Sequence, residues 1–269
     1  MDLTASAVAA RQRLDEALVV RGLVETRSRA RALILARDVL VNGAVVDRAG
    51  AAVKPSDAIS LVEKARFVSR GGEKLDHALD RFGIAVDGLV AADVGASTGG
   101  FTDCLLQRGA VRVYAVDVGY GQIADKLRAD PRVVVLDRTN ARHLRDLPEP
   151  VDIATIDVSF ISLKLVLPAV ATLLRPDADC VPLIKPQFEA GPKEVGKGGV
   201  VRDPATHRRV LEEVLAAAAA VGFGCSGLTA SPLRGPAGNI EFLAALRLGE
   251  TGAGIGSLVD AAMREAAER

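Results

Sequence analysis

Six short stretches of mostly apolar, β-branched residues recur after residue 88, and stretches with helical periodicity separate them. These stretches are Leu89–Val94, Val111–Asp117, Val133–Leu136, Asp152–Asp157, Cys180–Ile184 and Ile240–Leu246. Neighbouring parallel strands need a long crossover, usually a helix, whereas antiparallel strands need only a short turn. The alternation therefore predicts an α/β domain with a mostly parallel sheet and helices on both of its faces.

A smaller region precedes this alternation. Its first predicted helix carries Leu14 and Leu18 on one side and ends near Gly22, and a second helix is predicted over Ser28–Arg37. Asn42-Gly43 then lies between two β-branched stretches, which is a strong signal for a hairpin turn. The sequence thus predicts a small α+β domain at the N-terminus, before the larger α/β domain.

Length and composition agree with two folded domains. At about 150 residues per domain, 269 residues suffice for roughly two, and 49% hydrophobic with 25% charged residues is ordinary for a globular chain. The three cysteines, Cys104, Cys180 and Cys225, stand far apart in apolar surroundings, which favours buried thiols in a reducing compartment over disulfides.

The chain carries no sign of a membrane segment. No apolar stretch approaches the ~18 residues of a membrane span, and the N-terminal sequence lacks the basic-then-apolar order of a signal peptide. We therefore expect a cytoplasmic protein with no membrane contact.

Charge is distributed unevenly along the chain. The 34 Lys and Arg residues balance the 34 Asp and Glu residues, yet residues 1–66 carry eleven basic against eight acidic side chains, a net charge of +3. Within Arg21–Arg37 five arginines face one acid, Glu25. A local basic patch of this kind suits a phosphate backbone, although a solvated helix face would give the same composition.

This N-terminal region resembles the RNA-binding fold of ribosomal protein S4. The resemblance rests on the pattern Arg-x-Leu-Asp, Ser-Arg-x-x-Ala and Val-Asn-Gly between Arg13 and Gly43. It implies that a basic helix pair and the following hairpin grip structured RNA. The candidate RNA contacts are Arg11, Arg13, Arg27, Arg29 and Arg31.

A glycine-rich loop follows the first strand of the larger domain. Asp93 ends that strand, and the loop and the helix it opens contain Gly95, Ser97, Thr98, Gly99 and Phe101. Nicotinamide-binding loops hold a pyrophosphate at a helix N-terminus, and an acid inside the loop would repel that anion. An acid beside Gly-x-x-x-Gly suits a cofactor with a cationic amino group and no phosphate, which describes S-adenosylmethionine.

Acids also end the next two strands. Asp117 ends the second strand, 24 residues after Asp93, where a doubly wound sheet places the residue that accepts the ribose hydroxyls. Asp137 ends the third strand, and with Thr139 and Asn140 it is a candidate contact for adenine and ribose. The alternative is that these acids only cap helices or close turns.

Neither a nucleoside triphosphate nor a metal ion is predicted. Gly191–Lys197 matches a phosphate-binding loop, but Gly198 replaces the Ser or Thr that would hold magnesium. We interpret it as a flexible, lysine-bearing substrate loop, with an inert surface loop as the alternative. His77, His143 and His207 lack metal-ligand spacing with the cysteines, so surface or capping roles are expected for them.

Four charged residues stand where a sheet of this type exposes side chains. Asp157 and Lys185 each follow an apolar strand, Glu241 begins the last strand, and Lys74 lies in the first turn of a helix that starts after Gly71-Gly72. Ligands of such sheets bind at the carboxyl ends of the parallel strands. The four residues are therefore the candidate catalytic set, with structural ion pairs at strand ends as the alternative.

Residues 70–246 resemble the FtsJ-like ribose 2′-O-methyltransferases, whose Lys-Asp-Lys-Glu set falls on these four positions. The whole chain resembles the TlyA family of bacterial rRNA 2′-O-methyltransferases, also called hemolysins. The motifs that carry this resemblance are Asp93-x-Gly-Ala-Ser-Thr-Gly-Gly-Phe-Thr, Asp117-Val-Gly-Tyr-Gly-Gln, Asp157-x-Ser-Phe-Ile-Ser-Leu, Lys185-Pro-Gln-Phe-Glu and Gly199-Val-Val-x-Asp. Phe67 departs from the family, whose interdomain linker often has Trp there. The extended C-terminal helix resembles a longer subtype, which implies cytidine modification in both ribosomal subunits.

The resemblance implies a Rossmann-like class I methyltransferase domain at residues 71–269, a linker at 64–70 and an S4-like domain at 1–63. It also implies S-adenosylmethionine as cofactor and the ribosomal RNA of the 30S or 50S subunit, or of both, as partner. The sequence leaves open which nucleotide is modified, whether both subunits are substrates, and the oligomeric state.

The chemistry of the reaction agrees with the four residues. A ribose hydroxyl is a poor nucleophile near neutral pH, so methyl transfer to it needs proton removal or stabilisation of the developing alkoxide. We expect Lys185 to hold and activate the hydroxyl, Asp157 and Glu241 to orient it, and Lys74 to assist. The rival functions are an RNA-binding assembly factor without methyl transfer and a membrane-active hemolysin. Intact catalytic positions speak against the first, and the lack of an apolar span speaks against the second.

Overall fold

The computed structural model describes residues 11–62, 65–252 and 254–268. The chain divides into two compact units, and the boundary between them along the chain lies between Ala65 and Arg66. Residues 1–10 of the first expected domain, and Glu63 and Lys64 at the expected domain boundary, lie outside the described residues. The domain limits at 63 and 71 remain predictions.

The small unit combines two helices with short strands around a core that includes Leu14, Leu18 and Ile34. A three-stranded sheet has the order β3-β2-β5, and β1 pairs with β4. The elements are β1 (Gln12–Arg13), α1 (Leu14–Val20), α2 (Arg27–Leu35), β2 (Val39–Val41), β3 (Ala44–Val45), β4 (Ala52–Val53) and β5 (Ile59–Leu61).

The predicted hairpin of this unit is confirmed. Strands β2 and β3 are antiparallel, with Leu40 opposite Val45. The φ angles of Asn42 and Gly43 are +51° and +81°, and a two-residue hairpin turn of the primed type requires positive φ at both positions. Asn and Gly tolerate this conformation better than other residues, which is why this pair marks the turn.

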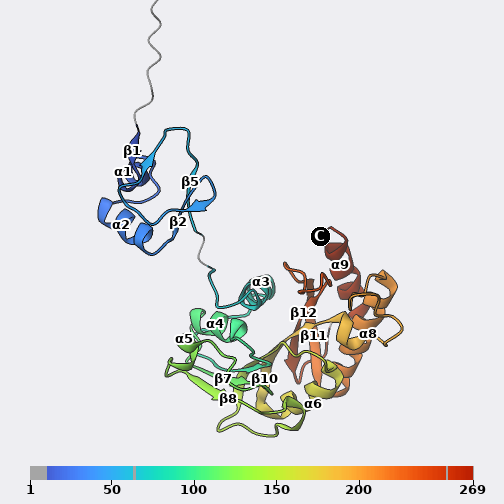
Figure 1. Cartoon of the computed structure of the whole chain (residues 1–269). Helices are drawn as coiled ribbons and strands as arrows, with labels where there is room; N and C mark the ends of the chain where they lie inside the picture. The colour runs from blue at the N-terminus through green and yellow to red at the C-terminus, as the bar shows by residue number, and fades with distance from the viewer. Residues whose placement is uncertain (1–10, 63–64, 253, 269) are drawn as a thin grey trace, which may run out of the picture. The chain divides into compact units, whose positions relative to one another are not determined.

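The larger unit holds a seven-stranded sheet between two layers of helices (Figure 1). Its helices are α3 (Gly71–Phe82), α4 (Gly100–Gln107), α5 (Asp125–Arg128), α6 (Leu163–Leu173), α7 (Pro186–Glu189), α8 (Pro204–Ala220), α9 (Ile255–Ala267) and the 3₁₀ helix η1 (Ala141–His143). Its strands are β6 (Val90–Val94), β7 (Arg112–Val116), β8 (Val133–Leu136), β9 (Val151–Ile156), β10 (Leu174–Ile184), β11 (Phe223–Ala230) and β12 (Phe242–Leu248).

The strand order is β11-β12-β10-β9-β6-β7-β8. The five strands from β10 to β8 are parallel to their neighbours, and β12 is antiparallel to both β10 and β11. The chain runs outward from β6 through β7 to β8 and then returns to the other side of β6 as β9. This reversal is the switch point at which ligands bind in open α/β sheets. The α/β fold class predicted from the alternating strands is confirmed.

Two hydrophobic clusters cover the two faces of the sheet. One includes Leu75 of α3 and Leu105 of α4, and the other includes Leu167 of α6, Leu211 of α8 and Val259 of α9. Both faces of the central strands are buried, which explains why these strands are mostly apolar in the sequence and do not alternate between apolar and polar residues.

Helix α8 begins with a capping acid and a proline. The carboxylate of Asp203 accepts hydrogen bonds from the backbone N–H groups of Ala205 and Thr206, and Pro204 fills the first helical position, where its missing N–H costs nothing. The prediction for His207 on this helix was wrong. His207 is buried, with its ring against Phe242 and its Nε2 atom 3.2 Å from the carbonyl oxygen of Val201, because α8 presents this position to the sheet.

The three cysteines are buried and free of disulfide bonds, as predicted. In the described ranges, the structure contains no helix with the length and apolar character needed to cross a bilayer.

Candidate active site

The ends of β6 and β9 approach each other closely at the switch point. Gly95 follows β6 with a φ of +89°, and a Cβ atom there would lie 2.5 Å from the carbonyl oxygen of Asp157, which follows β9. Only glycine fits this contact and this backbone conformation. The first glycine of the loop therefore sets the position of a predicted catalytic residue.

A cavity of about 500 Å³ opens beside this loop, and we call it the loop cavity. Gly95, Ser97, Asp117, Asn140 and Asp157 are among the residues that line it. Its described lining contains two carboxylates and neither Lys nor Arg. A cofactor with phosphate groups would find no cationic partner in this lining, whereas a cationic nucleoside would find two acids.

Asp117 lies at the carboxyl end of β7 and is tied to the glycine loop. Its Oδ2 atom accepts a hydrogen bond of 2.7 Å from the N–H of Ser97, and its Oδ1 atom accepts one of 2.7 Å from the N–H of Gly119. Ser97 has a φ of +48°, an uncommon value for a residue with a side chain. Each carboxylate oxygen keeps a lone pair that can accept a ribose hydroxyl.

Asp93 lies elsewhere. It is the fourth residue of β6, its side chain is fully buried, and it is not part of the lining of the loop cavity. Its carboxylate accepts hydrogen bonds from Thr102 of α4 at 2.6 Å and from Thr155 of β9 at 3.4 Å. Burial, with a smaller contribution from the charge of Asp157, raises the pKa of Asp93 to about 7. The structure thus places this acid below the loop, where it ties α4 to β9.

The remaining predicted cofactor residues divide into two groups. Gly95, Ser97, Asp117 and Asn140 line the loop cavity. Thr98, Gly99, Phe101, Asp137 and Thr139 do not. Phe101, the second residue of α4, is buried in the core, and the Asp137 carboxylate pairs with Arg128 at 3.3 Å.

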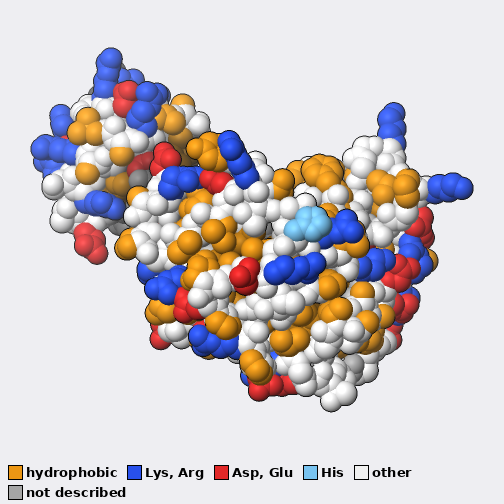
Figure 2. All heavy atoms as spheres, turned by 90° about the horizontal axis from the view of Figure 1, so that it is seen from below, with side chains coloured by type: hydrophobic (Ala, Val, Ile, Leu, Met, Phe, Trp, Pro, Cys, Tyr) orange, Lys and Arg blue, Asp and Glu red, His pale blue; other side chains and the backbone are white. Residues whose placement is uncertain are grey.

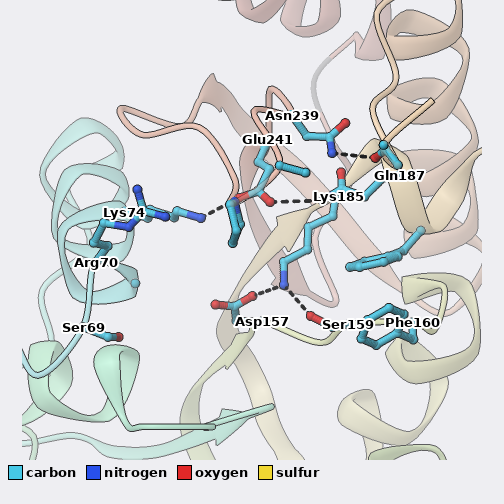
Figure 3. A pocket seen from close by; sticks show the side chains of 16 residues that line it. Ser69, Arg70, Lys74, Asp157, Ser159, Phe160, Lys185, Gln187, Asn239 and Glu241 are labelled. Atoms are coloured by element: carbon cyan, nitrogen blue, oxygen red, sulfur yellow. Dashed lines mark hydrogen bonds and ion pairs between the residues drawn. The ribbon is translucent and has the colours of Figure 1, made fainter. Parts of the chain in front are cut away.

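A second cavity, also of about 500 Å³, brings together all four predicted catalytic residues (Figure 3). We call it the lysine cavity. Lys74 comes from α3, Asp157 and Lys185 follow β9 and β10, and Glu241 precedes β12. Lys74 Nζ lies 2.5 Å from Glu241 Oε2, and Lys185 Nζ lies 2.5 Å from Asp157 Oδ1. Each lysine is therefore paired with an acid of its own.

The two pairs differ in exposure. The Lys74 and Glu241 side chains are 9% and 1% exposed, whereas those of Lys185 and Asp157 are 12% and 23% exposed. Lys185 Nζ also donates a hydrogen bond of 3.0 Å to Ser159 Oγ. The ammonium thus pairs with one carboxylate and donates one hydrogen bond, and it has donor capacity left for a ligand oxygen. Lys185 is thus the better placed of the two lysines to touch a substrate.

The two cavities meet at the segment that follows β9. Asp157, Ser159 and Phe160 line both of them. Phe160 is 91% exposed and has a φ of +63°, and its ring centroid lies 4.9 Å from that of Phe188. A fully exposed aromatic ring on an uncommon backbone conformation offers a flat apolar surface at the shared mouth.

Glu189 holds the two catalytic segments together. It ends α7, four residues after Lys185, and its carboxylate accepts hydrogen bonds from Ser162 Oγ at 2.5 Å and from the N–H of Leu163 at 2.7 Å. These two groups begin α6, five and six residues after Asp157. The carboxylate is therefore a helix cap supplied by a distant segment, and it fixes the Asp157 segment against the Lys185 segment.

Sequence reasoning assigned no role to Ser159, Phe160, Gln187 or Glu189. All four lie in the two motifs that follow β9 and β10. Their position just after a strand end was the only feature of the sequence that could have indicated a role in the site. Gln187 donates a hydrogen bond of 3.2 Å to Glu241 Oε1, and its own Oε1 atom is buried without a hydrogen-bond partner in the described part of the chain. Contacts between distant segments could not be read from either motif.

The loop that resembles a phosphate-binding loop forms one wall of the lysine cavity through Gly198 and Gly199. Asn239, 2% exposed, anchors it by donating to the carbonyl oxygen of Gly199 at 2.8 Å and accepting from the N–H of Val201 at 2.9 Å. Lys193 and Lys197 of this loop are exposed. Its role as a substrate loop remains a prediction.

The five predicted RNA-contacting arginines lie in the small unit and are all exposed. Three of them, Arg13, Arg27 and Arg31, converge on the carboxylate of Asp15, while Arg11 and Arg29 stand outside this cluster. In Figure 2 several Lys and Arg side chains lie on the visible face of the small unit, the lobe on the left.

Comparison with known proteins agrees with both units. Residues 67–248 match the model of the FtsJ-like methyltransferases, and residues 12–59 match that of the S4 domain. The chain is 49% identical over 246 residues to the 16S/23S rRNA (cytidine-2′-O)-methyltransferase TlyA of Mycobacterium tuberculosis, covering 89% of this chain and 91% of that protein. It is 43% identical over 235 residues to Hemolysin A of Brachyspira hyodysenteriae, covering 86% of this chain and 98% of that protein.

Among solved structures, a protein from Streptococcus thermophilus described as a hemolysin superposes with a TM-score of 0.72 at 42% identity, covering 97% of this chain and 98% of that one. The family match covers more than half of the chain, and both sequence relatives are covered over most of their length. The chain is therefore a member of the FtsJ-like methyltransferase family, in the group that includes TlyA and carries an S4 domain.

Proposed function

We propose that this protein transfers a methyl group from S-adenosylmethionine to the 2′-oxygen of a ribose, in a cytidine of ribosomal RNA. The observation that carries the proposal is the convergence of Lys74, Asp157, Lys185 and Glu241 in one cavity. That cavity shares Asp157 with a second one whose lining suits a cationic nucleoside. A methyl donor and a methyl acceptor would thus meet at the segment after β9.

The loop cavity is the proposed cofactor site. S-adenosylmethionine, when bound, supplies an electrophilic methyl group on a sulfonium. Asp117 would accept the ribose hydroxyls of the nucleoside, since its carboxylate is already held by the N–H groups of Ser97 and Gly119. Asn140, at the start of η1, and Gly95 would bound the nucleoside on either side. The two carboxylates of the lining would favour a positively charged ligand.

Lys185 is the proposed contact for the substrate hydroxyl. Its ammonium, held by Asp157 and Ser159, can donate a hydrogen bond to the 2′-oxygen and stabilise negative charge as it develops there. The hydroxyl proton leaves to water as the bond between the 2′-oxygen and the methyl carbon forms. Asp157 fixes the nitrogen, and the Lys74–Glu241 pair holds the opposite wall.

Phe160 is the proposed contact for the base of the target nucleotide. A ribose hydroxyl reaches the lysine cavity only if its nucleotide leaves the RNA stack, which exposes the base. The exposed ring of Phe160, at the mouth of both cavities, can replace a lost stacking partner.

The small unit is the proposed RNA-binding module. Its arginine cluster would neutralise phosphates and position the ribosomal subunit, and the lysine cavity would select the hydroxyl. An enzyme with this substrate acts where ribosomes are assembled, so we place it in the cytoplasm.

Transfer of labelled methyl groups tests the proposal. Purified 30S and 50S subunits that lack the modification are incubated with the full chain and labelled S-adenosylmethionine, and calorimetry measures cofactor binding in parallel. We expect cofactor binding and label in the RNA of at least one subunit. Replacing Asp117 with Asn should weaken cofactor binding, whereas Lys185→Met should stop transfer with the cofactor still bound, because Lys185 does not line the loop cavity. Cofactor binding without transfer to either subunit would favour an RNA-binding assembly factor and refute the proposal.

A further inference from the structure

The carboxylate of Asp15 has an unusual environment for an acid on a basic surface. Asp15 is the second residue of α1, and its side chain has no exposed area. Its Oδ1 atom accepts a hydrogen bond from Arg13 Nε at 3.0 Å, and its Oδ2 atom accepts from Arg27 Nη2 at 3.1 Å and from Arg31 Nε at 3.0 Å. Three arginines from two elements thus share one carboxylate.

The arginines themselves remain open to solvent. The side chains of Arg13, Arg27 and Arg31 are 48%, 48% and 54% exposed. Arg31 meets Asp15 through Nε, which leaves both of its Nη groups for an external oxygen. Arg27 also contacts Glu16 at 3.1 Å, so the three cations and two acids leave a net charge of +1. The cluster is cationic on the side that faces solvent.

The position of Arg13 is fixed from a second direction. A Cβ atom on Gly50 would lie 2.9 Å from Arg13 Nη1, so the guanidinium packs directly on the backbone there. A buried carboxylate is costly without partners, and its hydrogen bonds therefore have a strong tendency to stay formed. The hydrogen bond from Arg13 is the largest of several influences that hold the pKa of Asp15 well below its usual range. The carboxylate therefore stays ionised near neutral pH.

We propose that Asp15 is a positioning residue for RNA binding: it holds Arg13, Arg27 and Arg31 as one preorganised array that contacts neighbouring phosphates of the RNA backbone. The inference rests on the proposed RNA-binding function of the small unit and adds to it a residue that touches no RNA. Long arginine side chains lose conformational freedom when they bind, and an array that is ordered beforehand loses less.

A positioning role for Asp15 and simple electrostatics predict opposite effects of Asp15→Asn on the affinity for RNA. Coulomb's law predicts that removal of a negative charge near a polyanion strengthens binding. A positioning role predicts weaker binding, because the arginines then adopt many orientations. Asp15→Asn distinguishes the two, and Asp47→Asn is its matched control, since Asp47 is an exposed acid of the same unit.

Binding of the full-length variants to unmodified 30S and 50S subunits, measured at several salt concentrations, is the test. We expect Asp15→Asn to weaken binding by about tenfold. The plot of log affinity against log salt should also become less steep, by about one to two, because each lost phosphate contact reduces the magnitude of its slope by ~0.9. Asp47→Asn should bind as tightly as the wild type or more tightly. The single-turnover rate at saturating subunit concentration should not change. Unchanged or tighter binding by a folded Asp15→Asn protein would overturn the proposal.

Arg31→Lys keeps the test valid if Asp15→Asn unfolds the small unit, and a double-mutant cycle extends the test if Asp15→Asn stays folded. Arg31→Lys retains the charge but loses the Nε contact, so we expect weaker binding, and full affinity would contradict the array. In a double-mutant cycle, Arg31→Ala should cost far less in the Asp15→Asn background than in the wild type, whereas additive losses would refute a positioning role. If the wild type itself does not bind subunits, the proposed function fails; if it binds and these variants bind equally well, only this inference fails.

Discussion

In the small unit three arginines share the carboxylate of Asp15, whereas in the lysine cavity of the larger unit each lysine has its own acid. The shared acid leaves a net positive surface with free N–H groups, which suits a polyanion. The one-to-one pairs leave no net charge, and they fix single nitrogens at defined points. In the function that we propose, the same ionic chemistry serves affinity for RNA in one unit and placement of one hydroxyl in the other.

The largest effect should follow loss of the lysine that we assign to the hydroxyl. We expect Lys185→Met to lower the single-turnover rate of methyl transfer by at least about 10²-fold, because the 2′-oxygen loses its activating group. Affinities for cofactor and subunits should not change. Lys164→Met is the control, since Lys164 pairs with Glu213 on α6 and α8, away from the cavity. If the rate stays within a few-fold of the wild-type value, Lys185 does not activate the hydroxyl, and the contrast between affinity in the small unit and hydroxyl placement in the larger unit is wrong.

Loss of the exposed ring should have the next largest effect. Stacking on an aromatic side chain contributes about 1–3 kcal/mol per base, so Phe160→Ala should lower kcat/KM for the subunit by about 5- to 150-fold. Phe160→Tyr keeps the ring and the backbone requirement and should retain most of the activity. Equal losses in both variants would indicate that the segment, and not the ring, is important.

Glu189 should have a moderate effect through the two catalytic segments. Glu189→Gln keeps the size of the side chain but replaces charge-assisted hydrogen bonds to Ser162 and Leu163 with neutral ones, a loss of about 1 kcal/mol. We expect about fivefold lower kcat with unchanged KM for the cofactor. Glu212→Gln, at an exposed pair with Arg208 on α8, should leave kcat at the wild-type value. A change in cofactor KM alone would contradict a role in joining the segments.

Asp93→Asn should affect activity least and stability in a pH-dependent way. Burial raises the pKa of Asp93 to about 7, above its value in the unfolded chain, so the folded protein binds the extra proton between about pH 4 and 7. The wild type then loses stability as pH rises through this window, by at most about 1.4 kcal/mol per pH unit from this group, and the loss is complete above it. In urea unfolding, the free energy of unfolding of Asp93→Asn should increase relative to that of the wild type between pH 5.5 and 8.

The opposite outcome for Asp93 would be equally informative. If Asp93→Asn abolishes cofactor binding while the protein remains folded, the acid touches the cofactor, as the sequence suggested, despite its burial under the loop. If the stability difference between variant and wild type does not change with pH, Asp93 is ionised throughout.

The sequence predicted the parallel sheet well because its five parallel strands contain mostly apolar stretches and helices separate them. Strand β11 was not predicted, because Phe223–Ala230 contains two glycines, a serine and a threonine, and its pairing with β12 stabilises it as an edge strand. Asp93 was expected to reach the cofactor crevice from the end of the predicted strand Leu89–Val94, but it lies within β6, one residue before its end, and its side chain is buried in the core.

The convergence of the four cavity residues was predictable in part. Asp157 and Lys185 follow parallel strands, so their shared edge is a consequence of the fold. The pairing of Lys74 with Glu241, 167 residues apart, depends on how α3 packs against β12, and local periodicity carries no information on that. The role that we propose for Asp15 could not be predicted from the sequence for another reason. A sum of charges counts Asp15 only as one negative charge and does not show that three arginines contact it.

The position of the transferred methyl group shows whether the acceptor is a ribose hydroxyl or a base. After reaction of the wild type with unmodified 30S and 50S subunits and labelled S-adenosylmethionine, the RNA is hydrolysed with alkali. If the protein methylates a ribose 2′-oxygen, the label appears in alkali-resistant dinucleotides, because a methylated 2′-oxygen cannot attack the neighbouring phosphate. Label recovered only in mononucleotides would place the methyl group on a base and contradict the account.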